Sequence, residues 1–430
     1  MTNKTSIIIL TYNNLKYTKN CIDSIKKYTK DNTYEIIIID NNSIDGTRDW
    51  LKKQKNIKII LNDDNKGFPI GCNQGIEIAD KENDILLLNN DTIVTKNWLE
   101  NLKICLYSDN KIGAVGSVCN QNENMQGVDF TYDNLETMQK LAEINNKLDS
   151  NKWEEKVFLI GFCLLIKREV IEKIKKLDVN YTPGYIEDND LSLRIISLGY
   201  KLILCHDSFI HHYLGTSFRK DLDKFYPILN KNRQYFERKW KFNTFCFDEI
   251  KNYSLPLIEN PKKILEVNCG IGITLLNLKY KYKNLVIEGV QEDKNKYIIC
   301  SKIFKTYHNL REIKNQKYDY ILIGNYLEQV NEPSKFLEKI KKYMKDDGFI
   351  IGEIHKLNYI TTLKELENGI WYEKHKNEKN NFTIQDVDKL LFQCNFKKDN
   401  SILWKYNNLD DSNINNDSKY FYYSFRYKKN

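Results

Sequence analysis

Short, unbroken runs of isoleucine and leucine, spaced by helix-length segments, constrain the fold of this chain more than any other feature. Between runs, the sequence has helical periodicity: Leu15, Ile22 and Ile25 share one face of a helix over 15–28. Strands that are apolar throughout are buried on both faces, which is typical of a parallel sheet covered by helices. The sequence therefore predicts an α/β fold whose first strands are residues 6–11, 35–40, 57–61 and 84–88.

Polar residues directly follow three of these strands, at 11–14, 40–42 and 89–91. Ligands of such sheets bind beyond the carboxyl ends of the strands, so we expect these residues at a binding site. Asp91 alone could cap the next helix or bind a metal ion, and its position leaves both interpretations open.

Acidic and imidazole side chains recur later, where IEDNDLSLR spans 186–194 and FIHHYLGTS contains two of the six histidines. Carboxylates gathered in one cleft cost free energy unless a proton or cation compensates them. Magnesium and manganese favour oxygen ligands, manganese also accepts imidazole, and both keep substrate phosphates in their shell. One carboxylate, one imidazole and a diphosphate would make such a site, in which the metal acts as a Lewis acid on the departing diphosphate.

The order of these segments resembles the family 2 glycosyltransferases of the GT-A fold, over roughly residues 1–245. The matching pieces are SIIILTYNN, EIIIIDNNSIDGT, NDDNKGFPIGCNQGI, ILLLNNDTIV, FLIGFCLLIKREVIEKIKKLD, GYIEDNDLSLRIISLGYKLILCHDSFIHHYLGTSF and NRQYFERKW. The resemblance implies an inverting transfer of a sugar from a nucleotide-diphosphate donor, expected to be a UDP-sugar. The expected acceptor is a hydroxyl of a surface glycan or of a surface protein such as flagellin.

The resemblance also assigns a donor pocket. It implies that Thr11 and Asp40 line the nucleotide site, with Asp40 accepting a hydrogen bond from the base. Asn65 and Gly67 belong to a loop that the family places beside the donor. The same residues, with Phe68, could instead only shape a tight turn.

The metal site and the catalytic base come from the same resemblance. Asp91 takes the metal position of the DxD motif, with Asn89 in place of the first carboxylate. His212 has the family's spacing before the serine of GTS and is favoured over His211 as metal ligand. Asp188 matches the catalytic base of the ED pair, which the reaction requires because a hydroxyl is a poor nucleophile until a carboxylate takes its proton.

Neighbouring residues have structural interpretations of their own. Glu187 could complement the dipole of the helix that it begins, or act directly. Arg194 is expected to pair with Asp190. Structural or core positions are expected for His206, Tyr235 and Trp240.

A second α/β pattern begins after residue 250, where ILEVNCGIG at 264–272 follows an expected strand and precedes a helix. Glycine at such a turn permits close approach of a ligand. The motif resembles the first motif of class I S-adenosylmethionine-dependent methyltransferases, with similarity over roughly 255–400. The resemblance implies a Rossmann-like fold and a methyl-donor site containing Glu266, Gly270, Gly272 and Gln291.

Three departures from that family affect the expected activity. Asn268 replaces a glycine, Gln291 replaces the acid that holds the ribose hydroxyls, and Gln329 replaces the histidine of LEH. A hydrogen bond to a charged group contributes about 1.5–3 kcal/mol, so the loss at Gln291 favours a degenerate domain that holds the acceptor or a partner. An active O-methyltransferase acting on the transferred sugar is the alternative.

Charge and composition bound the remaining choices. Residues 1–250 carry 35 basic and 35 acidic side chains, so the net charge of +8 belongs to residues 251–430, and two domains are expected with that boundary. The basic residues are interleaved with acids, which disfavours nucleic acid as a partner. No apolar run approaches the roughly 20 residues of a membrane-spanning helix or forms a signal peptide, and the ten cysteines lack CxxC spacing, which favours a reducing cytoplasm.

Three functions follow from these observations. The main prediction is a metal-dependent inverting glycosyltransferase. The alternatives are a bifunctional glycosyl and methyl transferase, and a non-catalytic subunit of glycan assembly.

Overall fold

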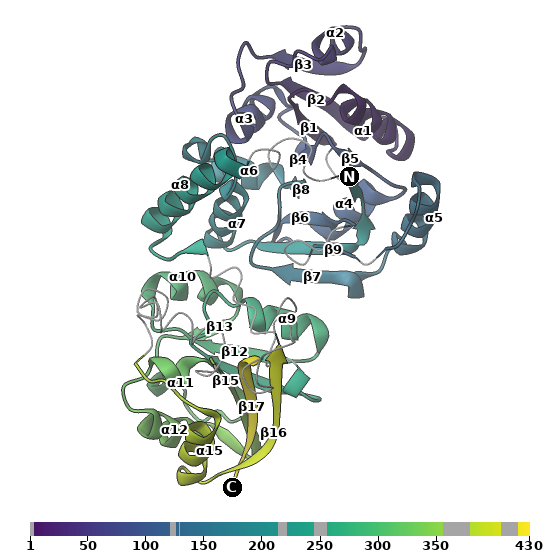
Figure 1. The fold of residues 1–430 in the computed structure, drawn as a ribbon. Helices are drawn as coiled ribbons and strands as arrows, with labels where there is room; N and C mark the ends of the chain where they lie inside the picture. The colour runs from purple at the N-terminus through teal and green to yellow at the C-terminus, as the bar shows by residue number, and fades with distance from the viewer. Residues whose placement is uncertain are drawn as a thin grey trace, which may run out of the picture. The chain divides into compact units, whose positions relative to one another are not determined.

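The computed structural model describes residues 4–120, 126–128, 130–213, 222–244, 256–355, 379–405 and 420–430. The chain forms two compact units, Met1–Asp248 and Glu249–Asn430 (Figure 1). The boundary expected near residue 250 lies outside the described residues. Among the described helices, none combines the length and the apolar character needed to cross a membrane.

The first unit is built on an eight-stranded sheet of order β3-β2-β1-β4-β8-β6-β9-β7. The four strands expected from the sequence pair in parallel, as predicted. Beyond them the sheet is mixed, because β8 runs antiparallel to both β4 and β6. The strands are β1 Thr5–Thr11, β2 Tyr34–Asp40, β3 Ile57–Leu61, β4 Asp84–Asn89, β6 Ile112–Val118, β7 Trp153–Lys156, β8 Cys163–Ile166 and β9 Lys201–Phe209.

Helices cover both faces of this sheet (Figure 1). On one face, α1 (Leu15–Tyr28) and α4 (Trp98–Ser108) share a buried core with the alternate residues Ile7 and Ile9 of β1. On the other, α3 (Phe68–Ile78) lies so close to β1 that a Cβ at Gly75 would lie 2.5 Å from Cγ2 of Ile8. The other helices are α2 Thr47–Leu51, α5 Leu135–Asn145, α6 Arg168–Ile174, α7 Glu187–Ser197 and α8 Leu222–Trp240.

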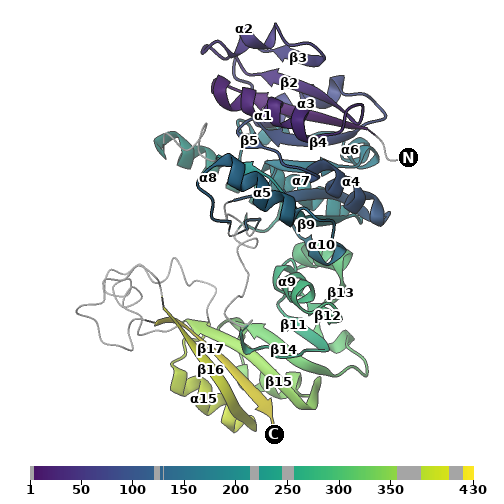
Figure 2. The ribbon, with the colours of Figure 1, turned by 90° about the vertical axis from the view of Figure 1, so that its right-hand side faces the viewer.

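The second unit is a seven-stranded sheet of order β13-β12-β11-β14-β15-β17-β16. Its first five strands are parallel and follow the doubly wound order, and β17 enters antiparallel between β15 and β16. The strands are β11 Lys263–Val267, β12 Val286–Val290, β13 Lys305–Tyr307, β14 Tyr318–Gly324, β15 Met344–His355, β16 Phe396–Lys405 and β17 Tyr420–Lys429. The helices are α9 Ile273–Lys281, α10 Lys294–Ile303, α11 Tyr326–Gln329, α12 Pro333–Lys341 and α15 Ile384–Gln393, the last lying beside β16 in Figure 2.

Both sheets place their first strand between their second and fourth strands. The connections therefore leave this central strand towards opposite edges, and open α/β sheets bind their ligands at such a point, beyond the carboxyl ends of the central and fourth strands. In the first unit this position lies after β1 and β4, and in the second after β11 and β14. Each unit thus has a topological place for a ligand.

Candidate active site

Asp91 and His212 meet beside the carboxyl end of β4. The short strands β5 (Thr92–Ile93) and β10 (His211–His212) pair antiparallel and bring His212 opposite Thr92. As a result, Nε2 of His212 lies 3.1 Å from Oδ1 of Asp91 and 3.3 Å from Nδ2 of Asn89. The three side chains expected at the donor and metal site therefore lie in contact, with Nε2 of His212 between the other two.

The two neighbouring histidines face different partners because side chains alternate along a strand. Nδ1 of His211 lies 2.6 Å from the hydroxyl of Tyr132. Burial and the charge of His212 lower the pKa of His211 to about 4. Burial also opposes protonation of His212, but the hydrogen bond and charge of Asp91 outweigh it and raise that pKa to about 9.

The donor atoms at this point suit a magnesium or manganese ion. A carboxylate oxygen and an imidazole nitrogen face each other, and the Asn89 amide has an oxygen that can join them. Among the described residues, no group of three or more histidine, cysteine, aspartate and glutamate side chains could hold a metal ion. A cation here would complete its shell with water and the phosphates of a donor.

Two consecutive residues connect this point to Asp188. The backbone N–H of Gly161 donates to Oδ2 of Asp188 over 3.4 Å. The carbonyl of Phe162 accepts from the N–H of Asn89 over 2.9 Å, and the Phe162 ring stacks on His212 with centroids 5.2 Å apart. One dipeptide thus touches both the expected base and the expected metal-binding group.

Glu187, which is buried, and Asp188, which is half-buried, form an acidic pair in the first turn of α7. Burial raises the pKa of Asp188. Burial and the charge of Asp188 raise the pKa of Glu187 to about 8. Oε2 of Glu187 has no hydrogen-bond partner among the described residues, so Glu187 is the member of the pair that retains a proton near neutral pH.

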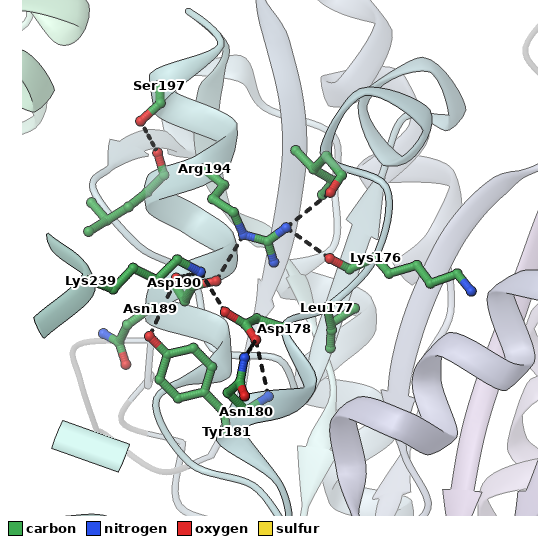
Figure 3. Close-up of polar contacts among 12 residues, drawn as sticks. Lys176, Leu177, Asp178, Asn180, Tyr181, Asn189, Asp190, Arg194, Ser197 and Lys239 are labelled. Atoms are coloured by element: carbon green, nitrogen blue, oxygen red, sulfur yellow. Dashed lines mark hydrogen bonds and ion pairs between the residues drawn. The ribbon is translucent and has the colours of Figure 1, made fainter. Parts of the chain in front are cut away.

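A polar network fixes the helix that carries Asp188 (Figure 3). The fully buried Asp190 accepts from Nε of Arg194 over 2.8 Å, which confirms the expected pair, and from Nε1 of Trp240 over 2.9 Å. Lys239 lies 2.7 Å from both Asp190 and Asp178. These contacts anchor α8 to α7, and Trp240 contributes a hydrogen bond that the expected core role did not include.

The expected nucleotide pocket lies at the ends of β1 and β2, where Thr11 and Asp40 are register partners. Asp40 is fully buried; its Oδ2 accepts from the N–H of Ser43 over 3.1 Å and lies 3.4 Å from Arg48. Its Oδ1 has no hydrogen-bond partner among the described residues. The hydroxyls of Thr11 and Thr18 are hydrogen-bonded to each other over 2.9 Å.

Asn65 and Gly67 form the turn before α3. Oδ1 of Asn65 accepts from the N–H of Gly67 over 3.0 Å, and Gly67 has a φ of 77°, which favours glycine. The next N–H, of Phe68, donates to the carbonyl of Pro183 over 2.8 Å. The turn therefore joins α3 to the segment that precedes Asp188.

In the second unit, the glycine turn after β11 has positive φ at Asn268, Gly270 and Gly272, and Glu266 is buried before it. Nε2 of Gln291 donates to the carbonyl of Gly270 over 3.2 Å, and its Oε1 accepts from the N–H of Asp293 over 2.9 Å. The backbone of the turn suits a ligand such as the methyl donor. Gln291 acts as a brace for the turn, since both ends of its amide are occupied.

Three further polar residues, which no expected site included, are hydrogen-bonded at the same edge of this sheet. Oε2 of Glu328 lies 3.0 Å from Nδ1 of His355, whose Nε2 lies 2.8 Å from the hydroxyl of Tyr422. The sequence signal was small: Glu328 belongs to the LEQ motif, and His355 is one of six histidines. Tyr422 comes from a strand whose pairing no local pattern reveals.

Two family models match different parts of this chain. Residues 6–175 match the family model "Glycosyl transferase family 2", and residues 235–399 match the model "Methyltransferase domain". Glycosyltransferase GlyG of Streptococcus pneumoniae is 27% identical over 216 residues, which cover 47% of this chain and 68% of GlyG. Glycosyltransferase AglE of Haloferax volcanii is 25% identical over 211 residues, 47% of this chain and 64% of AglE. N-methyltransferase 4 of Papaver somniferum is 26% identical over 174 residues, 36% of this chain and 48% of that protein.

Proposed function

Because this chain joins a domain of glycosyl transferase family 2 to a methyltransferase domain, we propose that it is an inverting glycosyltransferase that uses a UDP-sugar and a divalent cation. The proposed acceptor is a hydroxyl of a surface glycan or of a surface protein such as flagellin. The observation that carries the proposal is the Gly161–Phe162 dipeptide, which contacts Asp188 on one side and Asn89 and His212 on the other. The proposed proton acceptor and the proposed metal-binding residues therefore contact adjacent residues of the chain.

In the proposed reaction, Asp188 accepts the proton of the acceptor hydroxyl. The acceptor oxygen bonds to the anomeric carbon while the bond from that carbon to the diphosphate oxygen breaks, and in-line attack inverts the centre. Burial of Asp188 raises its pKa and so strengthens it as a base. Glu187, which retains its proton, adds no second negative charge beside it.

Asp91 and His212, with Asn89, would hold the cation, which supplies Lewis-acid stabilisation of the leaving diphosphate when bound. The open carboxylate oxygen of the buried Asp40 supports its proposed contact with the base of the nucleotide, since a buried acceptor without a partner costs free energy until a ligand supplies a donor.

The test uses matched variants of the full chain. Asp188→Asn should lower UDP release from a panel of UDP-glucose, UDP-galactose and UDP-N-acetylglucosamine by about 10²–10⁴-fold, while calorimetric binding of UDP is retained. Asp91→Ala and His212→Gln should remove the part of UDP binding that depends on manganese. His211→Gln is the control, because its ring faces Tyr132, and it should keep that dependence.

The alternatives give different results. Undiminished UDP release by Asp188→Asn would contradict the assigned base. No UDP release from any donor by the wild-type chain would favour the non-catalytic assembly subunit.

The second unit has two candidate roles. The occupied amide of Gln291 supports a domain that holds the acceptor. The hydrogen-bonded set Glu328, His355 and Tyr422, at the edge where a methyl donor would bind, supports methyl transfer as a second activity.

A further inference from the structure

Glu328, His355 and Tyr422, which we call the relay, lie at the carboxyl edge of the second sheet. His355 ends β15, Tyr422 is its antiparallel partner on β17, and Glu328 lies on α11 directly after β14. The glycine turn reaches the same place, because Nδ2 of Asn268 donates over 3.4 Å to Oε1 of Gln329, the chain neighbour of Glu328. This edge, at the central and fourth strands, is where doubly wound sheets bind their ligands.

The contacts of the relay define the direction of its hydrogen bonds. Oε1 of Glu328 accepts from the backbone N–H of His355 over 2.9 Å, and Oε2 lies 3.0 Å from its Nδ1. A carboxylate only accepts, so Nδ1 of His355 donates to Glu328. In the neutral form of the ring, Nε2 then accepts the hydroxyl proton of Tyr422 over 2.8 Å. A phenol oxygen can accept a hydrogen bond while its own proton is donated.

Glu328 is the buried end of the relay. The side chain of Glu328 is 2% exposed and that of His355 is 17% exposed, and Tyr422 is half-buried. A buried carboxylate that orients an imidazole, which in turn bonds a hydroxyl, is the arrangement by which proteins activate hydroxyl groups. The relay therefore combines a buried carboxylate, an imidazole and a hydroxyl at the end of β15.

We propose that the relay takes the proton from a sugar hydroxyl while that oxygen is methylated, with S-adenosylmethionine as the methyl-donating substrate. This inference rests on methyl transfer as the second activity of the chain. The acceptor oxygen bonds to the methyl carbon, and the carbon–sulfur bond breaks with its electron pair left on the sulfur of S-adenosylhomocysteine. The acceptor proton passes to the Tyr422 oxygen as the Tyr422 proton passes to Nε2 of His355.

A hydroxyl acceptor fits the relay better than an amine does. A neutral amine has a nucleophilic lone pair without a base, whereas a neutral hydroxyl is a poor nucleophile and needs its proton removed as it attacks. The first unit, by the proposed function, handles sugars, which supply such hydroxyls. In this reaction Tyr422 is the catalytic residue, and His355 and Glu328 are positioning residues.

The first arm of the test needs no turnover. Nitrogen NMR of the ¹⁵N-histidine-labelled full chain, with His355→Gln to assign the signal among six histidines, should show His355 neutral and protonated on Nδ1. Tyr422→Phe should shift the Nε2 signal, because that nitrogen loses its hydrogen bond. A proton on Nε2 would overturn the proposal.

The second arm measures release of S-adenosylhomocysteine with p-nitrophenyl glycosides of glucose, galactose and N-acetylglucosamine as acceptors. Tyr422→Phe and His355→Gln should each lower kcat by about 10²–10⁴-fold. The KM of S-adenosylmethionine and the calorimetric Kd of S-adenosylhomocysteine should stay unchanged. Tyr423→Phe is the matched control, because its phenol donates to Asp388 over 3.3 Å instead, and it should keep kcat.

Two results would overturn the inference. One is retained kcat in Tyr422→Phe. The other is a wild-type chain that binds no S-adenosylhomocysteine or methylates none of the glycosides. If UDP release persists in that case, the glycosyl transfer proposal stands and only the relay is wrong. If UDP release is absent and methyl transfer is intact, the relay stands and the glycosyl transfer proposal is wrong.

Discussion

At the scale of single residues, the environment of a carboxylate decides its role in this protein. Asp188 and Glu187 are adjacent in the chain, yet only Asp188 accepts a hydrogen bond from the Gly161 backbone, and Glu187 has an oxygen without a partner among the described residues. Asp190, two positions further, is neutralised by Arg194 and Lys239. Three carboxylates in one turn therefore serve as proposed base, proton-holding neighbour and helix anchor.

The raised pKa of Glu187 makes the stability of the first unit depend on pH. Its pKa rises from 4.5 to about 8 on folding, so between these values the folded chain binds the extra proton and the free energy of unfolding falls as pH increases. Glu187→Gln should remove this loss, so the fall in Tm from pH 5 to pH 8 should be smaller in the variant than in the wild type. The difference should be about 2–4 °C for each kcal/mol of unfolding free energy that the wild type loses. Calorimetry at both pH values tests this; the same Tm difference in the variant and the wild type would contradict it.

Gln291 gives a second prediction at this scale. Gln291→Glu restores the family's acid but removes the N–H donor to the Gly270 carbonyl and places a negative charge beside that oxygen. We expect the second unit to lose about 1–3 kcal/mol of unfolding free energy. Urea unfolding measures this, with the exposed Glu292→Gln as control. Unchanged stability would show that the brace is unimportant.

At the scale of elements, local sequence patterns predicted most strands and helices of the first unit, but they did not predict the pairing of His355 with Tyr422 in the second unit. The helix over 15–28 and the strand over 57–61 lie where their periodicity placed them. The reversed direction of β8 follows from its neighbours in the sheet, which its apolar sequence does not encode. The pairing of His355 with Tyr422 joins residues 67 positions apart, so no local pattern could predict it.

The candidate site shows the same division. Asp91 and Asp188 could be proposed because each lies in a motif. In the structure Asp188 contacts Gly161, whereas Asp91 lies beside His212, whose ring stacks on Phe162. The hydrogen bonds of Gln291 could not be predicted. The resemblance singled out this position only because glutamine replaces the family's acid there, and that says nothing of what the glutamine contacts. Side-chain direction at a sheet edge depends on partners from distant segments.

The contact of α3 with β1 is a prediction at this scale. Gly75→Ala would place a Cβ 2.5 Å from Cγ2 of Ile8, a branched side chain that cannot turn away freely, and should cost about 1–3 kcal/mol. Urea unfolding of the first unit measures the loss. Gly116→Ala is the control, since its nearest neighbours are at 3.4 Å. Equal stability of the two variants would contradict the close packing of α3.

At the scale of the whole molecule, the two units have separate buried cores. The core of the first draws on residues from Ile7 to Ile210, and that of the second on residues from Leu265 to Tyr427. Because these described cores share no residue, each unit has its own source of stability.

Separate cores predict two unfolding transitions with different ligand responses. UDP with manganese should raise one Tm and S-adenosylhomocysteine the other, each by roughly 5–10 °C at a hundredfold excess over Kd. Differential scanning calorimetry of the full chain measures both. Single-transition unfolding, or a shift of both transitions by one ligand, would contradict independent stability.

The Gly161–Phe162 dipeptide has a consequence for how such an enzyme could change its substrates. A single peptide unit lies between Asp188, the proposed base, and His212, the proposed metal ligand. Changes of sugar or acceptor preference should therefore occur in the loops around this peptide unit. An insertion or deletion within it should impair the proposed proton removal and the proposed phosphate binding together.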